Sequence, residues 1–248
     1  MKKAVIAACA VTMLSASVHA DTLLGLYVGG SIWNAEASGS FGEIGSTDST
    51  FNLDDETNSH FYAALEHPIP LVPNLKFSSM DLTTTGTANV DFSFGGSSFD
   101  SDVNADIDLS YVDYTLYYEI FDNDLLSVDV GLTGRDFDGD VIVVESSNLD
   151  NSGTLDVSGV VPMIYVSTVI GLPFTGFDIF AEGNLLSFDD HTLYDYQAGV
   201  SYAVLDNLAV DFNINVGYRA MKLELSDLDD LNTNLDFKGF FAGAEIHF

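Results

Sequence analysis

The stretch LAVDFNINVGYR, at Leu208–Arg219, alternates strictly between apolar residues and polar or small ones. Successive side chains of an extended strand point to opposite faces, so this order places every apolar side chain on one face. An α-helix, with 3.6 residues per turn, would spread the same side chains around its axis. The stretch therefore predicts a long β-strand with one apolar and one polar face.

The same alternation recurs at Val112–Ile120, Leu126–Arg135, Phe177–Leu185 and Tyr194–Val204. Runs of about ten residues exceed the five or six that are usual in a β-sandwich, and they match tilted strands that cross a bilayer. Tyr and Phe are frequent on the apolar face, as in the interfacial girdles of membrane barrels. The pattern predicts an all-β fold, an antiparallel up-and-down transmembrane β-barrel.

Tight and long connections alternate along the chain, as the short periplasmic turns and longer external loops of outer membrane barrels do. The tight connections are His67–Asn74, Phe121–Asp124, Gly171–Gly176 and Leu205–Asn207. The long ones are Ala37–Asn58, Thr83–Asp106, Asp136–Val157, Ser187–Thr192 and Glu224–Leu235.

Ten strands fit between these connections, and an even number places both termini on the periplasmic side. They are Thr22–Glu36, Ser59–Glu66, Leu75–Leu82, Ile107–Ile120, Leu125–Arg135, Ser158–Ile170, Phe177–Leu185, Tyr194–Val204, Leu208–Leu223 and Asp236–Phe248. Ser59–Glu66 is short, and Ser158–Ile170 is apolar on both faces and contains Pro162. Eight strands is the alternative if one hairpin is misassigned.

Composition excludes several functional classes. The 248 residues carry 7 Lys+Arg against 38 Asp+Glu, a formal net charge of −31. Nucleic-acid binding and polybasic membrane attachment both need clustered Lys and Arg, which this chain lacks. A hydrophobic content of 47% separates it from acidic disordered chains.

The first twenty residues predict a cleaved secretory signal, which leaves residues 21–248 as one barrel domain. Lys2 and Lys3 form a positive start, Ala4–Ser17 is apolar and small, and small residues precede a cut after Ala20. A lipoprotein box ending at Cys9 is the alternative. Cys9 is the only cysteine, so the mature chain would have no disulfide and no thiol chemistry.

The last strand carries an apolar face that ends in a terminal phenylalanine: Phe240, Ala242, Ala244, Ile246 and Phe248. It resembles the assembly signal of bacterial outer membrane barrels. The mature amino terminus, with Gly29-Gly30 early in its first strand, and Glu66-His67-Pro68 resemble a largely uncharacterised family of proteobacterial outer membrane proteins. The resemblance implies a barrel in the outer membrane of a Gram-negative bacterium. It also implies contact with lipid and lipopolysaccharide, and with the barrel-assembly machinery and periplasmic chaperones during biogenesis.

The expected external loops contain 21 acidic residues and no Lys or Arg. Hard divalent cations prefer carboxylate oxygens and could bridge such loops to anionic lipopolysaccharide. Asp136, Asp138 and Asp140 have ligand-like spacing for a specific calcium site, although their glycine is misplaced for an EF-hand. A diffuse acidic surface is the other interpretation, and no other cofactor is expected.

Strand parity places many charged side chains inside the expected barrel. The acids are Glu66, Asp113, Glu119, Asp129, Asp178, Glu182, Asp195, Asp211 and Glu245, and the bases are Lys76, Arg135 and Arg219. One interpretation is a polar network that fills the barrel, helped by aromatic residues that include Trp33. The other is a narrow hydrated path that favours cations.

Two enzymatic alternatives stay open beside a structural or passive-pore role. An Asp–His pair at the external rim could act as the general base of a protease; the candidates are Asp189, Asp190 and His191, with Asp100, Asp102 and Asp106. A lipid esterase would need a serine near His60 or His191, and no persuasive one is evident. The expected role is therefore non-enzymatic.

Overall fold

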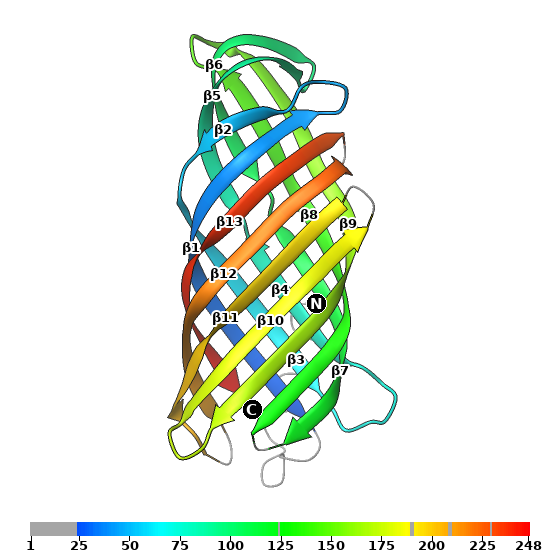
Figure 1. Ribbon diagram of the computed structural model, residues 1–248, viewed down its shortest axis with the longest axis vertical. Coiled ribbons are helices and arrows are strands. Elements are labelled where there is room, and N and C mark those ends of the chain that lie inside the picture. Colours follow the sequence, from blue (N-terminus) through cyan, green and yellow to red (C-terminus); the bar gives the residue numbers. More distant parts are fainter. Residues whose placement is uncertain (1–23, 124, 189–190, 208–209, 229) are drawn as a thin grey trace, which may run out of the picture.

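The computed structural model describes residues 24–123, 125–188, 191–207, 210–228 and 230–248 (Figure 1). The predicted signal segment and its cleavage site after Ala20 lie outside these residues. None of the described residues forms a helix long and apolar enough to span a membrane.

Ten strands form a closed ring of antiparallel neighbours, in the order β1-β3-β4-β7-β8-β9-β10-β11-β12-β13 and back to β1. Their bounds are β1 Gly25–Glu43, β3 Glu56–Glu66, β4 Asn74–Asp81, β7 Tyr111–Asn123, β8 Leu126–Glu145, β9 Asn148–Leu172, β10 Phe177–Phe188, β11 His191–Leu205, β12 Asp211–Leu228 and β13 Leu231–His247. The predicted fold class, an antiparallel up-and-down barrel with ten strands in its ring, is confirmed.

The first and last strands close the ring. β1 pairs with β13 from Tyr27↔His247 to Glu43↔Leu231. Leu26 and Phe248 extend the seam, because each backbone N–H donates to the other's carbonyl at 3.2 and 2.9 Å. Closure pairs the backbone groups that an open sheet edge would leave exposed to lipid.

The two ends of the barrel differ (Figure 1). The turn end carries the short connections after β3, β7, β9 and β11 and the ends of the described chain. The loop end carries the other connections and a further sheet segment built from β2 Ser49–Leu53, β5 Thr83–Phe94 and β6 Ser97–Asp108. There β1 pairs with β2, β2 with β5, β5 with β6, and β6 with β8, so the wall continues above β3, β4 and β7.

The long loops predicted at 37–58, 83–106, 136–157 and 224–235 are therefore wrong, because most of each segment is strand. β10 and β11 also extend into the fifth, at 187–188 and 191–192. β8 and β9 pair almost to the turn at 146–147. The predicted strand Ile107–Ile120 is divided, because β6 ends at Asp108 and β7 begins at Tyr111. The Ser, Thr, Gly and Asp of these segments resemble loop composition, yet they form the solvent-facing half of alternating strands.

Partway along the barrel the two faces of the strands exchange character: the apolar side chains change from the outer to the inner face. On β8 the outward side chains near the turn end are apolar, as at Leu132, which is 68% exposed, whereas Asp136 and Asp138 face outward farther on. The inward side chains of β8 are polar near the turn end, at Asp129 and Thr133, and apolar farther on. The turn-end half thus has an apolar exterior suited to lipid, and the loop-end half has a polar exterior over an apolar interior.

Candidate functional site

The interior holds three successive layers, of which the loop-end layer is apolar. Its side chains come from β2, β5 and β6 and from the loop-end halves of the ring strands. Fully buried members include Phe41, Phe94, Phe99, Ile107, Leu109, Phe137, Leu193, Leu223, Leu231 and Phe237. Aromatic rings pack within it, with Phe41 stacked on Phe51 at a centroid distance of 4.2 Å. This layer fills the barrel as a domain core would.

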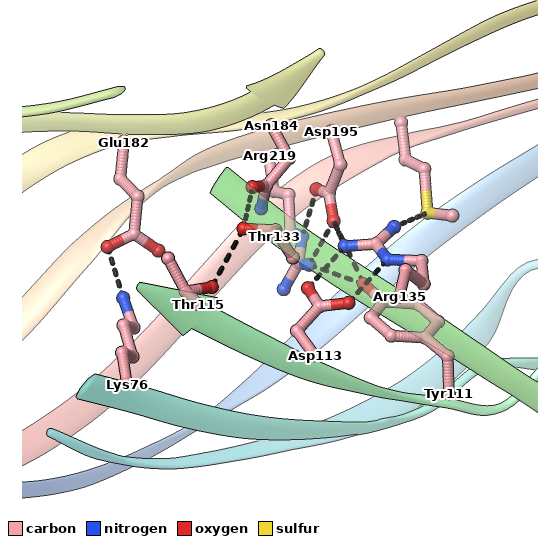
Figure 2. A network of polar contacts seen from close by, with 11 residues as sticks. Lys76, Tyr111, Asp113, Thr115, Thr133, Arg135, Glu182, Asn184, Asp195 and Arg219 are labelled. Atoms are coloured by element: carbon pink, nitrogen blue, oxygen red, sulfur yellow. Dashed lines mark hydrogen bonds and ion pairs between the residues drawn. The ribbon is translucent and has the colours of Figure 1, made fainter. Parts of the chain in front are cut away.

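The middle layer is an ionic cluster of Tyr111, Asp113, Arg135, Asp195 and Arg219 (Figure 2). Arg135 donates two hydrogen bonds to Asp113, at 2.8 and 2.7 Å, and one to Asp195 at 2.8 Å. Arg219 donates two to Asp195, at 2.8 and 2.7 Å, and one to the Tyr111 hydroxyl at 2.8 Å. The Tyr111 hydroxyl in turn donates to Asp195 at 2.9 Å.

The ionic cluster ties β7 and β8 to β11 and β12, which are separated by β9 and β10 in the ring. Two arginines and two aspartates make it neutral, and the Arg135 guanidinium lies 3.6 Å from the centroid of the Tyr111 ring. All five residues are buried, with Arg135 at 0% exposure. Buried charges are tolerated only when they are paired and hydrogen-bonded, and the four charged residues of this cluster are both. The cluster therefore bridges the barrel's interior.

The turn-end layer is a chamber of about 410 Å³ lined by polar and aromatic residues. Its carboxylates are Glu66, Glu119, Asp122, Asp129, Asp178, Glu182 and Glu245, and its tyrosines are Tyr27, Tyr62, Tyr117 and Tyr165. The lining reaches the turn end, since Asp122, Asp178 and Asn213 lie within three residues of a strand end. A smaller cavity of about 20 Å³ lies between the chamber and the ionic cluster. His60 and Lys76 line both this cavity and the chamber, and Arg219 of the ionic cluster also lines it.

Hydrogen bonds organise the chamber wall. Lys76 on β4 forms an ion pair with Glu182 on β10 (Figure 2). Glu182 also accepts a hydrogen bond from the Tyr165 hydroxyl at 3.1 Å. Tyr62 donates to Glu245, and Tyr117 donates to Glu66 at 2.9 Å. Outside the chamber lining, Thr115, Thr133 and Asn184 form a chain of hydrogen bonds beside the small cavity, with both contacts at 2.7 Å.

The structure distributes the charges expected inside the barrel over two of these layers. Asp113, Arg135, Asp195 and Arg219 form the ionic cluster. Glu66, Lys76, Glu119, Asp129, Asp178, Glu182 and Glu245 line the chamber. Asp211 lies at the turn end, where its carboxylate is 3.3 Å from His247 Nδ1.

The three aspartates considered for calcium lie on a strand and not in a loop. Asp136, Asp138 and Asp140 alternate along the outer face of β8, where residues two apart are about 6.6 Å apart. Asp140 lies directly opposite Asp108 on β6 and Asp156 on β9. Burial and these neighbouring carboxylates raise the pKa of Asp140. Among the described residues, no three His, Cys, Asp or Glu side chains are grouped to hold a metal ion.

Those residues considered for catalysis that the structure describes lie on different parts of the barrel. Asp100 and Asp102 face outward on β6, and Asp106 lies on the same outer face. Asp189 and Asp190 lie outside the described residues, and His191 at the start of β11 accepts a hydrogen bond from the Ser226 backbone at 3.3 Å. His60 is 5% exposed and lies inside the barrel, where it lines the chamber and not the external rim.

The turn-end half of the last strand presents the apolar side chains of the expected assembly signal outward. Phe240 is 75% exposed and packs edge-on against Tyr218, with ring centroids 5.3 Å apart. Phe248 is 40% exposed beside the β1–β13 seam. Ala242, Ala244 and Ile246 share the parity of Phe240, opposite to Phe241 and Glu245, which line the chamber.

Sequence reasoning missed several contributors to the chamber. Among them are Asp122, which it placed in the turn Phe121–Asp124, and the residues Tyr165 and Gln197. Tyr165 was concealed because its stretch is apolar on both faces, and Gln197 was assigned only to the polar side of β11. Both line the chamber. The signal that finds them is cross-strand register: Tyr165 lies opposite Gly131 and Asn184 on its neighbouring strands.

No protein-family model matches the chain, and a search of curated proteins found no match. The crystal structure of the outer membrane protease OmpT from Escherichia coli is similar, with a TM-score of 0.54 and 8% identity over 94% of this chain and 98% of that one. Neisserial surface protein A matches at a TM-score of 0.32 and 12% identity, covering 90% and 97% of the two chains. Ail, the attachment invasion locus protein of Yersinia pestis, also matches at 0.32 and 12%, covering 92% and 99%. At this identity the likeness to OmpT shows the fold alone: the chain has the fold of an outer membrane β-barrel.

Proposed function

We propose that the chain is an outer membrane β-barrel of a Gram-negative bacterium that acts as a closed scaffold displaying an acidic surface, and not as a channel. The turn end lies in the periplasm and the loop end outside the cell. The short connections at the turn end and the strand extension at the loop end support this orientation, because outer membrane barrels have short periplasmic turns and longer extracellular segments.

The closed interior is the observation that carries the proposal. An ion entering the chamber from the turn end would meet the ionic cluster and then the apolar layer. The cluster's side chains satisfy one another across the barrel, and residues of the apolar layer such as Phe94 and Leu193 are 0% exposed. Both layers would have to rearrange before a hydrated ion could cross.

Planar-bilayer recording tests closure. Protein whose folding is verified by heat-dependent gel migration should insert without steady conductance in KCl. Co-flotation with lipid vesicles is the control for insertion. A steady conductance would contradict the scaffold and support the passive path, and selectivity for K⁺ over Cl⁻ would then implicate the acidic chamber.

Single-cysteine labelling tests orientation, and it is clean because Cys9 is the only cysteine and lies in the predicted signal. Leu149→Cys places a thiol at the loop end, where Leu149 is 75% exposed, and Ile69→Cys places one at the turn end, where Ile69 is 58% exposed. An impermeant maleimide should label Leu149→Cys on intact cells and Ile69→Cys only after permeabilisation. The reverse pattern would overturn the orientation.

A cation-dependent surface role is the second candidate, favoured by the row Asp108–Asp140–Asp156 across three neighbouring strands. Like charges directly opposite one another are destabilising, and divalent cations could relieve them while bridging to lipopolysaccharide. Calcium-dependent binding to lipopolysaccharide vesicles that is lost in Asp140→Asn would support it, and binding unaffected by chelation would oppose it. No hydrogen bond or ion pair among the described residues favours the protease or esterase alternative.

A further inference from the structure

The chamber has a large excess of negative charge. Its lining contains seven carboxylates and, among the described residues, one lysine, Lys76, which is already paired with Glu182. Tyrosine hydroxyls donate to Glu66 and Glu245 but bring no positive charge. In a site partly shielded from water, such carboxylates gain from a cationic guest.

Two polar groups facing the chamber are independent signs of a ligand. His60 is 5% exposed and lines the chamber, yet its ring nitrogens have no hydrogen-bond partner among the described residues. The side-chain oxygen of Gln197 is buried and likewise has no hydrogen-bond partner among the described residues. Buried polar groups are normally satisfied, so this pair marks a place where a guest can donate hydrogen bonds.

Lys76 shows which chemistry the chamber holds. Its ammonium pairs with the Glu182 carboxylate and lies 5.0 Å from the ring centroid of Tyr62 and 5.5 Å from that of Tyr165. A carboxylate beside aromatic faces is a favourable environment for an alkylammonium group. Glu66 with Tyr117 repeats the carboxylate–tyrosine pairing without an ammonium group.

A flexible organic amine fits this wall better than a metal ion. The described residues contain no group of three ligands suited to a metal. Glu66, Glu182 and Glu245 each accept a hydrogen bond from a different tyrosine. Several ammonium groups on an alkyl chain can reach separated carboxylates. A volume of about 410 Å³ lies within the range of small-molecule sites.

We propose that the chamber binds a small aliphatic polyamine, with its ammonium groups held by Glu66 and Glu245, its chain against the tyrosine rings, and a terminal amine near His60 and Gln197. In the orientation proposed above the guest enters from the periplasm. Binding in detergent does not depend on that orientation or on channel closure.

Isothermal titration of the folded full-length mature protein with spermidine tests the proposal. Glu66→Gln and Glu245→Gln keep the oxygen that accepts the tyrosine hydrogen bond and remove the charge, so the double variant should fold. The matched control is Asp91→Asn with Asp100→Asn, which removes two facing charges from the outer face of β5 and β6. Mg²⁺ at equal ionic strength is the control for general counter-ion binding.

We expect saturable binding near one spermidine per barrel, weakened about tenfold or more in the chamber variant and unchanged in the outer-face control. Equal weakening in both variants, non-saturable binding, or displacement by Mg²⁺ as effective as by a second polyamine would overturn the proposal. If the chamber variant fails the gel test for folding, the wild-type stoichiometry and Mg²⁺ competition decide the question.

Discussion

Gly29 and Gly30 make room for two large aromatic neighbours on β3. Tyr62, Gly29 and Glu245 lie in one row across β3, β1 and β13, and the Tyr62 side chain crosses Gly29 inside the barrel to reach Glu245. Phe61 lies beside Gly30 and is 63% exposed on the outer face. The early Gly-Gly of the sequence thus has a steric role on both faces of β1.

Gly29→Ala should displace the Tyr62 ring, because the added Cβ would lie 2.5 Å from its Cζ. Overpacking of this kind costs about 1–3 kcal/mol, measurable by urea titration of the folded barrel in lipid. Adding Tyr62→Ala should remove most of the extra cost. An equal cost of Gly29→Ala with and without the Tyr62 ring would show that the close approach is not the cause.

Arg135→Met should destabilise the barrel strongly. It leaves Asp113 without its two arginine hydrogen bonds in a buried setting, and breaking such a pair costs about 3–5 kcal/mol. The double variant Arg135→Met with Asp113→Asn removes both charges and should recover part of the loss. Strict additivity of the two single effects in equilibrium unfolding would contradict the coupling.

At the scale of single strands, β13 both closes the ring and carries the apolar face that resembles an assembly signal. Deleting Phe248 removes the two backbone hydrogen bonds to Leu26 at the seam. We expect normal export but less folded barrel in purified outer membranes, as judged by heat-dependent migration. Phe248→Tyr, which keeps the backbone and an aromatic ring, is the control; undiminished folding after deletion would refute the signal.

The alternation of outward and inward side chains along β11 leads to a second prediction for single strands. Val200 is 40% exposed on the outer face, whereas its neighbour Ser201 lines the chamber. Val200→Lys should cost about 2–4 kcal/mol if the residue lies near the bilayer midplane, and Ser201→Lys should not incur this lipid penalty. Ile214 and Asn215 offer the same contrast on β12. Equal costs at both parities in folding titrations would show that the register is wrong.

The interior of the molecule is asymmetric along its axis, with a polar chamber at the turn end, an ionic cluster in the middle and an apolar layer at the loop end. In vesicles, a cationic methanethiosulfonate should therefore modify Ser201→Cys in the chamber. Ala105→Cys, in the apolar layer at 4% exposure, should resist it, and Val200→Cys should be shielded by lipid. Equal rates at Ser201→Cys and Ala105→Cys would reveal a continuous water path.

Local sequence was sufficient for the barrel, the ring of ten strands and the inward parity of the charged residues. Period-two alternation acts over adjacent residues, and the exterior of a membrane barrel must be apolar wherever it meets lipid. Arg135 and Asp195 could be placed inside from their own strands alone. The same pattern predicts the tight turns, because the alternation of apolar and polar residues stops where a turn begins.

Only the tertiary structure decided how the interior is divided. Beyond Asp136 on β8 the outer face is polar and the inner face apolar, so Thr and Asp alternating with Phe and Val form strands where composition predicts loops. Which arginine meets which aspartate depends on the register of strands far apart in sequence: Arg135 and Asp195 are 60 positions apart. A filled barrel and an open path likewise differ in the packed positions of side chains from many strands, since closure is a property of the assembled ring and not of any single strand.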